Sequence, residues 1–293
     1  MKKCIQNPKK WMWNKNFIDN NISIKFLGGI ALKIIAVVFM FVDHFGLIVF
    51  PQNDILRILG RISMPLFAFL IAIGMNYTSN RKKYLFRLLI YFIILQIPIT
   101  IFLLISNTNL GKGYVNIFFN LSTGAGFIYI YKYKKIWSIP YLILISIFLI
   151  LNDVPEFSSP IDVDYGWYGF YLIIGFFFSF EFTKNLKTKY SFLISKLFAI
   201  IILISLTLIW VNVSYLWLSL SNSSIPILST ISKRGIYDFS NKFQIYALFA
   251  IPFILFFKAK KEKSTSIVKY SFYLAYPLSF FIPTLISMII SIV

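Results

Sequence analysis

Long apolar runs separated by short polar connections constrain this chain more than any other feature. A helix needs about 20 apolar residues to cross a hydrocarbon core of roughly 30 Å. Nine such runs lie at about 26–50, 55–75, 84–105, 115–131, 136–151, 165–182, 194–213, 243–257 and 270–293. Only 13% of the residues are charged and 58% are hydrophobic, which excludes an ordinary soluble domain. The sequence predicts an all-α, polytopic transmembrane helix bundle of about nine spans, within a range of eight to ten.

The basic residues alternate between the connections. They are concentrated before the first run and in the second, fourth, sixth and eighth connections, whereas the connection at 152–164 is acidic. The positive-inside rule therefore predicts a cytoplasmic N-terminus and a multi-pass protein of the cytoplasmic membrane. A net charge of +19 is accounted for by these flanks, so we expect a lipid bilayer as partner and no nucleic acid.

The chain shows no sign of a second folded domain. Residues 1–25 mix Lys with Trp and Phe and have no apolar core before their charges end, which favours an interfacial amphipathic segment on the inner leaflet over a cleavable signal. Residues 26–293 are expected to form one transmembrane domain. Residues 212–241 are interpreted as an external or re-entrant segment, and the apolar stretch 215–231 is the alternative tenth span.

Ionisable residues inside the first two runs are the main candidates for chemistry. Each costs about 2.5–3.5 kcal/mol on insertion scales, so such residues are usually paired or functional. Asp43 and His44 lie in the outer part of the first run, and Arg57 and Arg61 begin the second at the same depth. An imidazole beside a carboxylate is typical of a general base, and guanidinium groups stabilise an oxyanion. We therefore predict catalytic roles for His44, Asp43, Arg57 and Arg61.

Simpler interpretations of the same residues stay open. Asp43 with Arg57 or Arg61 can form a structural ion pair, and His44 can be a core residue with satisfied hydrogen bonds. Lys33 and Arg87 can be long side chains that reach the membrane surface from the ends of their helices. His44 and Cys4 are the only residues of their types, which excludes a site with two imidazoles and an intramolecular disulfide. We expect no metal.

Further polar residues mark the two ends of the predicted bundle. Asn116, Asn120 and Asp164 open the fourth and sixth runs at the outer level, where one polar cavity can hold them. Lys33 shares a helical face with His44 but lies roughly 16 Å nearer the cytoplasm. The basic connections have a second possible role, which is to bind a phosphate-bearing cofactor from the cytoplasm.

These residues also carry a resemblance to a known family. The segments that resemble the TraX family are 31–36, 40–46 (Met-Phe-Val-Asp-His-Phe-Gly), 56–69, 80–89, 96–98, 116–119, 164–169 and 273–278. The match is dense over residues 31–98 and sparse thereafter, and it leaves 1–25 and 190–242 uncovered. Ser279 departs from the pattern, which usually has histidine there.

The resemblance implies a membrane acetyltransferase. The family's namesake acetylates the N-terminus of conjugative pilin, and wider groups of similar proteins move acetyl from cytoplasmic acetyl-CoA to sugars across the membrane. An essential early histidine in those groups would correspond to His44. The same comparison would make Asp43, Arg57 and Arg61 supporting groups. Our own hypothesis assigns substrate binding to Asn116, Asn120, Asp164 and Tyr276, and cofactor binding to Lys33, Arg81, Lys82, Lys83 and Arg87.

The resulting hypothesis is an acetyl-CoA-dependent acyltransferase. Acetyl-CoA would dock at the basic inner face, where Lys132, Lys134 and Lys135 are further candidates for its phosphates. His44, oriented by Asp43, would act as general base or transient acyl carrier toward a sugar, polymer or peptide acceptor from outside. The alternatives are a transporter or channel with an intramembrane charged pathway and a non-catalytic scaffold for surface-structure assembly.

Overall fold

The computed structural model describes residues 27–106, 114–153, 162–184, 186, 190–221, 243–258 and 266–292. Its elements, in chain order, are α2 (Gly29–Ile48), α3 (Asp54–Gly60), α4 (Ser63–Tyr77), α5 (Arg81–Ser106), β1 (Tyr114–Val115), α6 (Phe118–Tyr133), η2 (Lys135–Trp137), α7 (Ser138–Asp153), β2 (Asp162–Val163), α8 (Gly166–Thr183), α9 (Ser191–Ser221), η4 (Gln244–Ala250), α12 (Ile251–Phe256) and α13 (Ser266–Ile292). The predicted all-α class is confirmed. The two short strands form one parallel pair, with Tyr114 opposite Asp162.

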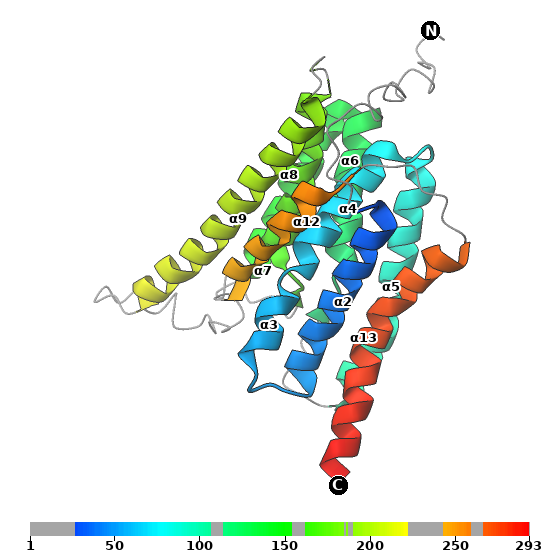
Figure 1. The fold of residues 1–293 in the computed structure, drawn as a ribbon, viewed down its shortest axis with the longest axis vertical. Helices are drawn as coiled ribbons and strands as arrows, with labels where there is room; N and C mark the ends of the chain where they lie inside the picture. Colours follow the sequence, from blue (N-terminus) through cyan, green and yellow to red (C-terminus); the bar gives the residue numbers. More distant parts are fainter. Residues whose placement is uncertain are drawn as a thin grey trace.

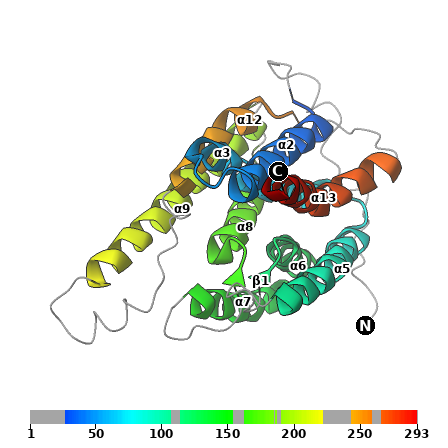
Figure 2. The same cartoon turned by 90° about the horizontal axis from the view of Figure 1, so that it is seen from below.

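The helices lie side by side along the long axis of the molecule (Figure 1). Helix α8 packs against α4, α6, α7 and α9, while α2 packs against α3, α4 and α13. Seen from one end (Figure 2), α13 lies beside α2 at the periphery of the bundle. Consequently α4 and α8 form the centre, and α2 presents one face to α4 and another to α13.

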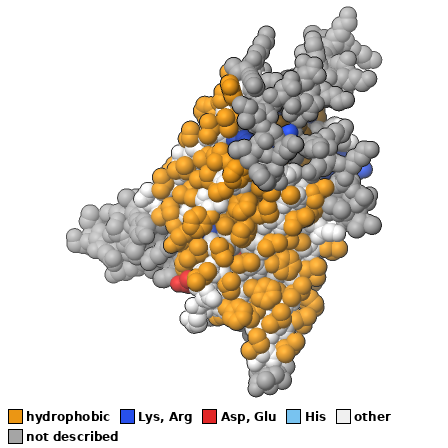
Figure 3. All heavy atoms as spheres, in the orientation of Figure 1, with side chains coloured by type: hydrophobic (Ala, Val, Ile, Leu, Met, Phe, Trp, Pro, Cys, Tyr) orange, Lys and Arg blue, Asp and Glu red, His pale blue; other side chains and the backbone are white. Residues whose placement is uncertain are grey.

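The exterior of the bundle is apolar. Side chains such as Ile93 and Ile97 of α5 are each 55% exposed, and the face seen in Figure 3 is largely hydrophobic. Six helical segments of the described chain are long and apolar enough to cross a membrane. This supports a multi-pass membrane protein. The count of nine spans, the cytoplasmic N-terminus and the identity of the membrane stay predictions.

The predicted span at 55–75 is not one continuous helix. It is divided into α3 and α4 at Arg61 and Ile62. The physical reason is Pro65, which has no N–H for the carbonyl of Arg61 and whose ring crowds that carbonyl. The break places Arg61 on a turn that faces α2.

Three further predictions concern residues 1–25, 212–241 and 243–257, and the described residues cover the second in part and the third in full. Residues 1–25 lie outside the described residues. Helix α9 runs on to Ser221, so it includes the start of the predicted external segment, and residues 222–242 also lie outside the described part. The run at 243–257 forms the 3-10 helix η4 followed by the short helix α12.

Candidate functional site

Asp43 of α2 binds two arginines from the adjacent element. Its carboxylate lies 2.8 Å from Nη1 of Arg57, and Nη2 of Arg61 donates to Oδ1 at 2.9 Å and to Oδ2 at 3.2 Å. The Asp43 and Arg61 residues are buried, at 7% and 6% exposure. The predicted juxtaposition of Asp43, Arg57 and Arg61 is therefore present, and the interpretation as a structural ion pair stays open beside a catalytic one.

The local sequence brings these charges together. Arg57 and Arg61 are four residues apart, and Nε of Arg61 donates to the carbonyl of Arg57 at 3.4 Å. Gly60 lies directly against Asp43: a Cβ added there would be 2.2 Å from Oδ1. Absence of a side chain at Gly60 thus permits α3 to approach α2 at the level of the carboxylate.

His44 lies next to Asp43 but has a different partner. Its Nδ1 is 2.7 Å from Oγ of Ser279 in α13, and the ring of Phe280 stacks against it at 3.7 Å between centroids. The residue is 8% exposed. We expected Asp43 to orient this ring, whereas the hydrogen-bond partner of Nδ1 is Ser279.

A second polar group surrounds Asp164 at the same end of the bundle. The hydroxyl of Tyr114 donates to its carboxylate at 3.2 Å, and Nδ2 of Asn120 donates to its carbonyl at 2.6 Å. Burial, followed by the charge of Asp164, raises the pKa of Tyr114 well above its usual range, so this phenol remains a donor. Asn120 and Asp164 are therefore adjacent, as predicted.

Tyr165 links the two polar groups. Its ring lies 5.7 Å from the guanidinium carbon of Arg61, and Asp164 is close enough for its charge to act on Arg61. Tyr165 has φ 60 and is the only non-glycine residue of positive φ in the described chain. Such strain persists only where surrounding structure enforces it, and it is frequent at functional sites.

One buried polar atom in this region, Oδ1 of Asn120, has no hydrogen-bond partner among the described residues. The hydroxyl of Tyr276 lies close to that of Tyr114, and the Tyr276 ring packs edge-on against Phe118 at 5.4 Å. Buried polar groups are normally satisfied, so Oδ1 of Asn120 is available to a bound polar molecule or to water.

Asn116 is not part of the polar groups around Asp43 and Asp164. Its Nδ2 donates to Oε1 of Gln96 at 2.8 Å, and its Oδ1 accepts from the N–H of Phe118 at 3.0 Å. These bonds fix the start of α6 against α5. The predicted substrate-binding role of Asn116 therefore has no support in its contacts.

The predicted cofactor-binding cations lie toward the opposite end of the bundle (Figure 1). Arg81 donates to the carbonyls of Met75 at 2.8 Å and Asn76 at 3.2 Å, while Lys82 and Lys83 are exposed on the first turn of α5. Arg87 lies over the ring of Tyr84 at 5.6 Å, and Lys33 over Phe272 at 5.6 Å. Arg81 thus joins α4 to α5.

Sequence reasoning missed the acidic residue among the cations at this end of the bundle. Glu181 of α8 forms ion pairs with both Lys132 of α6 and Lys184. Lys132 is also close enough to Arg81 for their charges to interact. A glutamate near the end of a Phe-rich run was the available signal.

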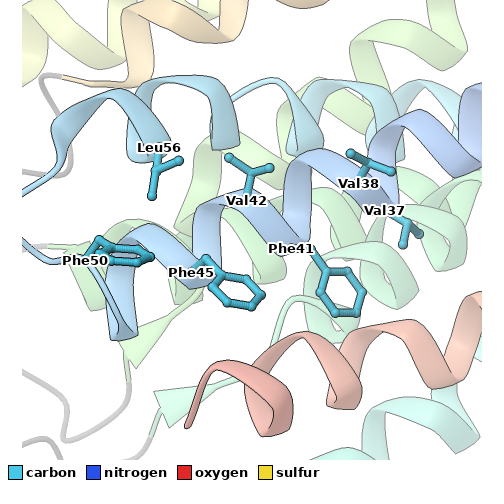
Figure 4. Close-up of a pocket in the computed structure, with 7 residues that line it drawn as sticks. All are labelled: Val37, Val38, Phe41, Val42, Phe45, Phe50 and Leu56. Carbon is cyan, nitrogen blue, oxygen red and sulfur yellow. The ribbon is translucent and has the colours of Figure 1, made fainter. Parts of the chain in front are cut away.

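An open apolar groove of about 560 Å³ lies on α2 and α3 (Figure 4). Its lining contains no polar side chain and comprises Val37, Val38, Phe41, Val42, Phe45, Phe50 and Leu56. It is therefore separate from the polar cluster around Asp43. In the described residues, no group of three or more His, Cys, Asp or Glu side chains is arranged to hold a metal ion.

The polar cluster at the Asp43 end of the bundle combines an imidazole, two carboxylates and two guanidinium groups from α2, α3, the α3–α4 turn and the turn between β2 and α8. Comparison of the sequence with known families gives a match: the model of the family described as TraX protein matches residues 29–287. This chain belongs to the TraX family. The match includes every residue of the cluster.

Two curated relatives are also similar to this TraX chain. One is an uncharacterized protein of Rickettsia prowazekii (strain Madrid E), 37% identical over 123 residues, which are 39% of this chain and 48% of that protein. The other is the probable fimbrial assembly protein FimC, serogroup H1, of Dichelobacter nodosus, 36% identical over 69 residues, or 22% of this chain and 28% of that protein. The chain thus matches less than half of either relative. No solved structure matches it.

Proposed function

We propose that this TraX-family protein is an integral membrane acyltransferase. It moves an acetyl or other small acyl group from cytoplasmic acyl-CoA to a hydroxyl or amine acceptor on the extracytoplasmic side. The observation that carries the proposal is His44: the only imidazole of the chain is buried in an apolar helix, beside Asp43 with its two arginines. A buried ionisable group of this kind in a membrane span is a functional-site hypothesis by default.

The chemistry requires one base and one oxyanion site. His44 takes a proton from the acceptor O–H or N–H, and the acceptor atom attacks the thioester carbonyl. The carbon–sulfur bond then breaks, and the CoA thiolate leaves and takes up a proton. Arg57 and Arg61 stabilise the oxyanion of the tetrahedral intermediate. Each guanidinium has five N–H donors, so binding to Asp43 leaves donors for this role.

The acyl donor would meet the inner end of the bundle. Arg81, Lys82 and Lys83 on α5, with Lys132 and Lys184 near Glu181, supply positive charge for the phosphates of CoA. The acyl group would then have to travel about 16 Å from the level of Lys33 to that of His44. The acceptor would enter beside Asn120, Asp164 and Tyr276.

The test uses inside-out membrane vesicles and acetyl-CoA labelled with ¹⁴C in the acetyl group. We expect vesicles with the wild-type protein to accumulate covalently bound label, and the His44→Ala vesicles to lose it by a factor of about 10²–10⁴. The control is Ile93→Ala, which changes an exposed residue of α5. If His44→Ala vesicles are labelled as strongly as wild type at equal protein abundance, His44 is not the base. If wild-type vesicles gain no covalent label, the proposed acyltransferase activity is wrong.

A second candidate is a non-catalytic scaffold. The similarity to the probable fimbrial assembly protein FimC of D. nodosus favours it. A scaffold would tolerate His44→Ala and co-purify with a surface-structure subunit. The same vesicles distinguish the two candidates, because a scaffold adds no covalent acetyl label.

A further inference from the structure

The hydroxyl of Ser279 has two neighbours and only one proton. Its Oγ lies 2.6 Å from the main-chain carbonyl of Tyr276 and 2.7 Å from Nδ1 of His44. A carbonyl oxygen has no proton to donate, so the bond to Tyr276 takes the hydroxyl proton of Ser279. The remaining lone pairs of Oγ face the imidazole.

Nδ1 of His44 must then be the donor. If Ser279 donated to Nδ1 instead, its oxygen would lie 2.6 Å from the Tyr276 carbonyl with no proton between them, which is repulsive. Both contacts are satisfied only when Nδ1 carries a proton. The neutral ring has one N–H, so Nε2 is the unprotonated nitrogen.

Among the described residues, the other polar group at the ring is the main chain of Ser279 itself. The Asp43 carboxylate is bound by Arg57 and Arg61, and the rings of Phe280 and Tyr276 also lie against the imidazole. Phe280 contacts the face of the ring, and therefore limits its rotation. Ser279 is fully buried, so water does not replace it readily.

We propose that Ser279 is a positioning residue that holds His44 as the Nδ1–H tautomer and leaves Nε2 bare. The use of Nε2 as the base rests on the proposed acyltransfer; the tautomer itself does not. The wrong tautomer would carry a proton on the nitrogen that has to accept one, which is costly in enzymes that use histidine as base.

The single histidine makes the tautomer directly measurable. Protein labelled with ¹⁵N-histidine and purified through a histidine-free tag gives one imidazole spectrum, in which couplings to the ring protons assign each nitrogen. At pH 8 we expect wild type to show a protonated Nδ1 and an unprotonated Nε2. A protonated Nε2, in the neutral ring or in an imidazolium, overturns the proposal even if Ser279→Ala fails to fold.

Variants of Ser279 test whether its hydroxyl sets the tautomer of His44. Ser279→Ala should lose the pure Nδ1–H spectrum, and Ser279→Thr, which keeps the hydroxyl, should retain it. The matched control is Ser179→Ala, since Ser179 is also buried and donates to the carbonyl three residues earlier, that of Phe176, at 2.8 Å. An unchanged tautomer in Ser279→Ala contradicts the assignment.

The vesicle assay adds the functional consequence. Ser279→Ala should slow acetyl incorporation roughly tenfold or more, and Ser279→Thr should restore it. If wild-type vesicles incorporate no label while the spectrum shows the Nδ1–H tautomer, the acyltransferase fails and the assignment of Ser279 stands. Full activity in Ser279→Ala with an altered tautomer overturns its positioning role.

Discussion

At the residue scale, Gly60 lies directly against Asp43 in the candidate site. Because a Cβ at position 60 would lie 2.2 Å from Oδ1 and 2.3 Å from Cβ of Asp43, Gly60→Ala must displace α3 or the carboxylate. We expect a loss of about 1–3 kcal/mol in stability, as for other overpacked sites, measured by thermal unfolding in detergent. Gly126→Ala is the control, since a Cβ added at Gly126 would meet only the far end of a side chain, the hydroxyl of Tyr141, at 2.8 Å. A Gly60→Ala protein that melts at the same temperature as wild type would contradict a tight α2–α3 contact.

Prediction from sequence succeeded for ion pairs whose partners can be recognised from their depth in the membrane alone. Asp43, Arg57 and Arg61 share a level in two consecutive runs, and opposite charges at one depth in a membrane pair. It failed for Ser279, which lies 235 positions from His44, because no local pattern shows which helix covers a given face. Tyr165 was missed for the same reason, whereas Glu181 carried a readable signal as an acidic residue near the end of a Phe-rich run.

At the scale of elements, Lys196 closes the end of a short helix. It lies on α9 and donates from Nζ to the carbonyl of Leu255 at 2.5 Å and to that of Phe257 at 3.4 Å. These carbonyls end the six-residue helix α12 and have no partner within it. Lys196 therefore joins α9 to a segment whose own hydrogen bonds are few.

Replacement of that lysine tests its role. Lys196→Met keeps the length of the side chain and removes the donors, so we expect a loss of about 1–3 kcal/mol and a lower melting temperature in detergent. Lys196→Arg, which retains N–H donors, should lose less. A Lys196→Met protein as stable as wild type would show that the α12 carbonyls find other partners.

The element boundaries show what the sequence conveys well. The predicted runs at 84–105, 136–151 and 165–182 agree closely with α5, α7 and α8. The break between α3 and α4 was readable in principle from Pro65, yet the uninterrupted apolar run concealed it. The β1–β2 pair joins residues nearly 50 positions apart, and no periodicity in two residues predicts it.

At the scale of the whole molecule, the polar groups divide between two ends. The C-terminal part of α2 and the turn before α8, which carry Asp43, His44 and Asp164, lie at one end; the start of α5 and the ends of α6 and α8, which carry Arg81 and Lys132 and precede Lys184, lie at the other (Figure 1). The basic end is predicted to be cytoplasmic. This assignment determines from which side each substrate would enter.

The orientation can be measured because the chain has one cysteine. In a Cys4→Ser background, Asn53→Cys and Lys134→Cys place a thiol at exposed positions on opposite ends. We expect an impermeant maleimide to label Asn53→Cys in intact cells, or spheroplasts where an outer membrane is present, and Lys134→Cys only after permeabilisation. The opposite result would invert the topology.

The pairing of Asp43 with Arg57 and Arg61 also bears on how the protein enters its membrane. The partners are 14 and 18 residues apart and are joined by the short turn after α2. They leave the ribosome almost together, before any later helix exists. The first hairpin can therefore pair its buried carboxylate with both guanidinium groups at the translocon, so that these ion pairs do not depend on assembly of the remaining bundle.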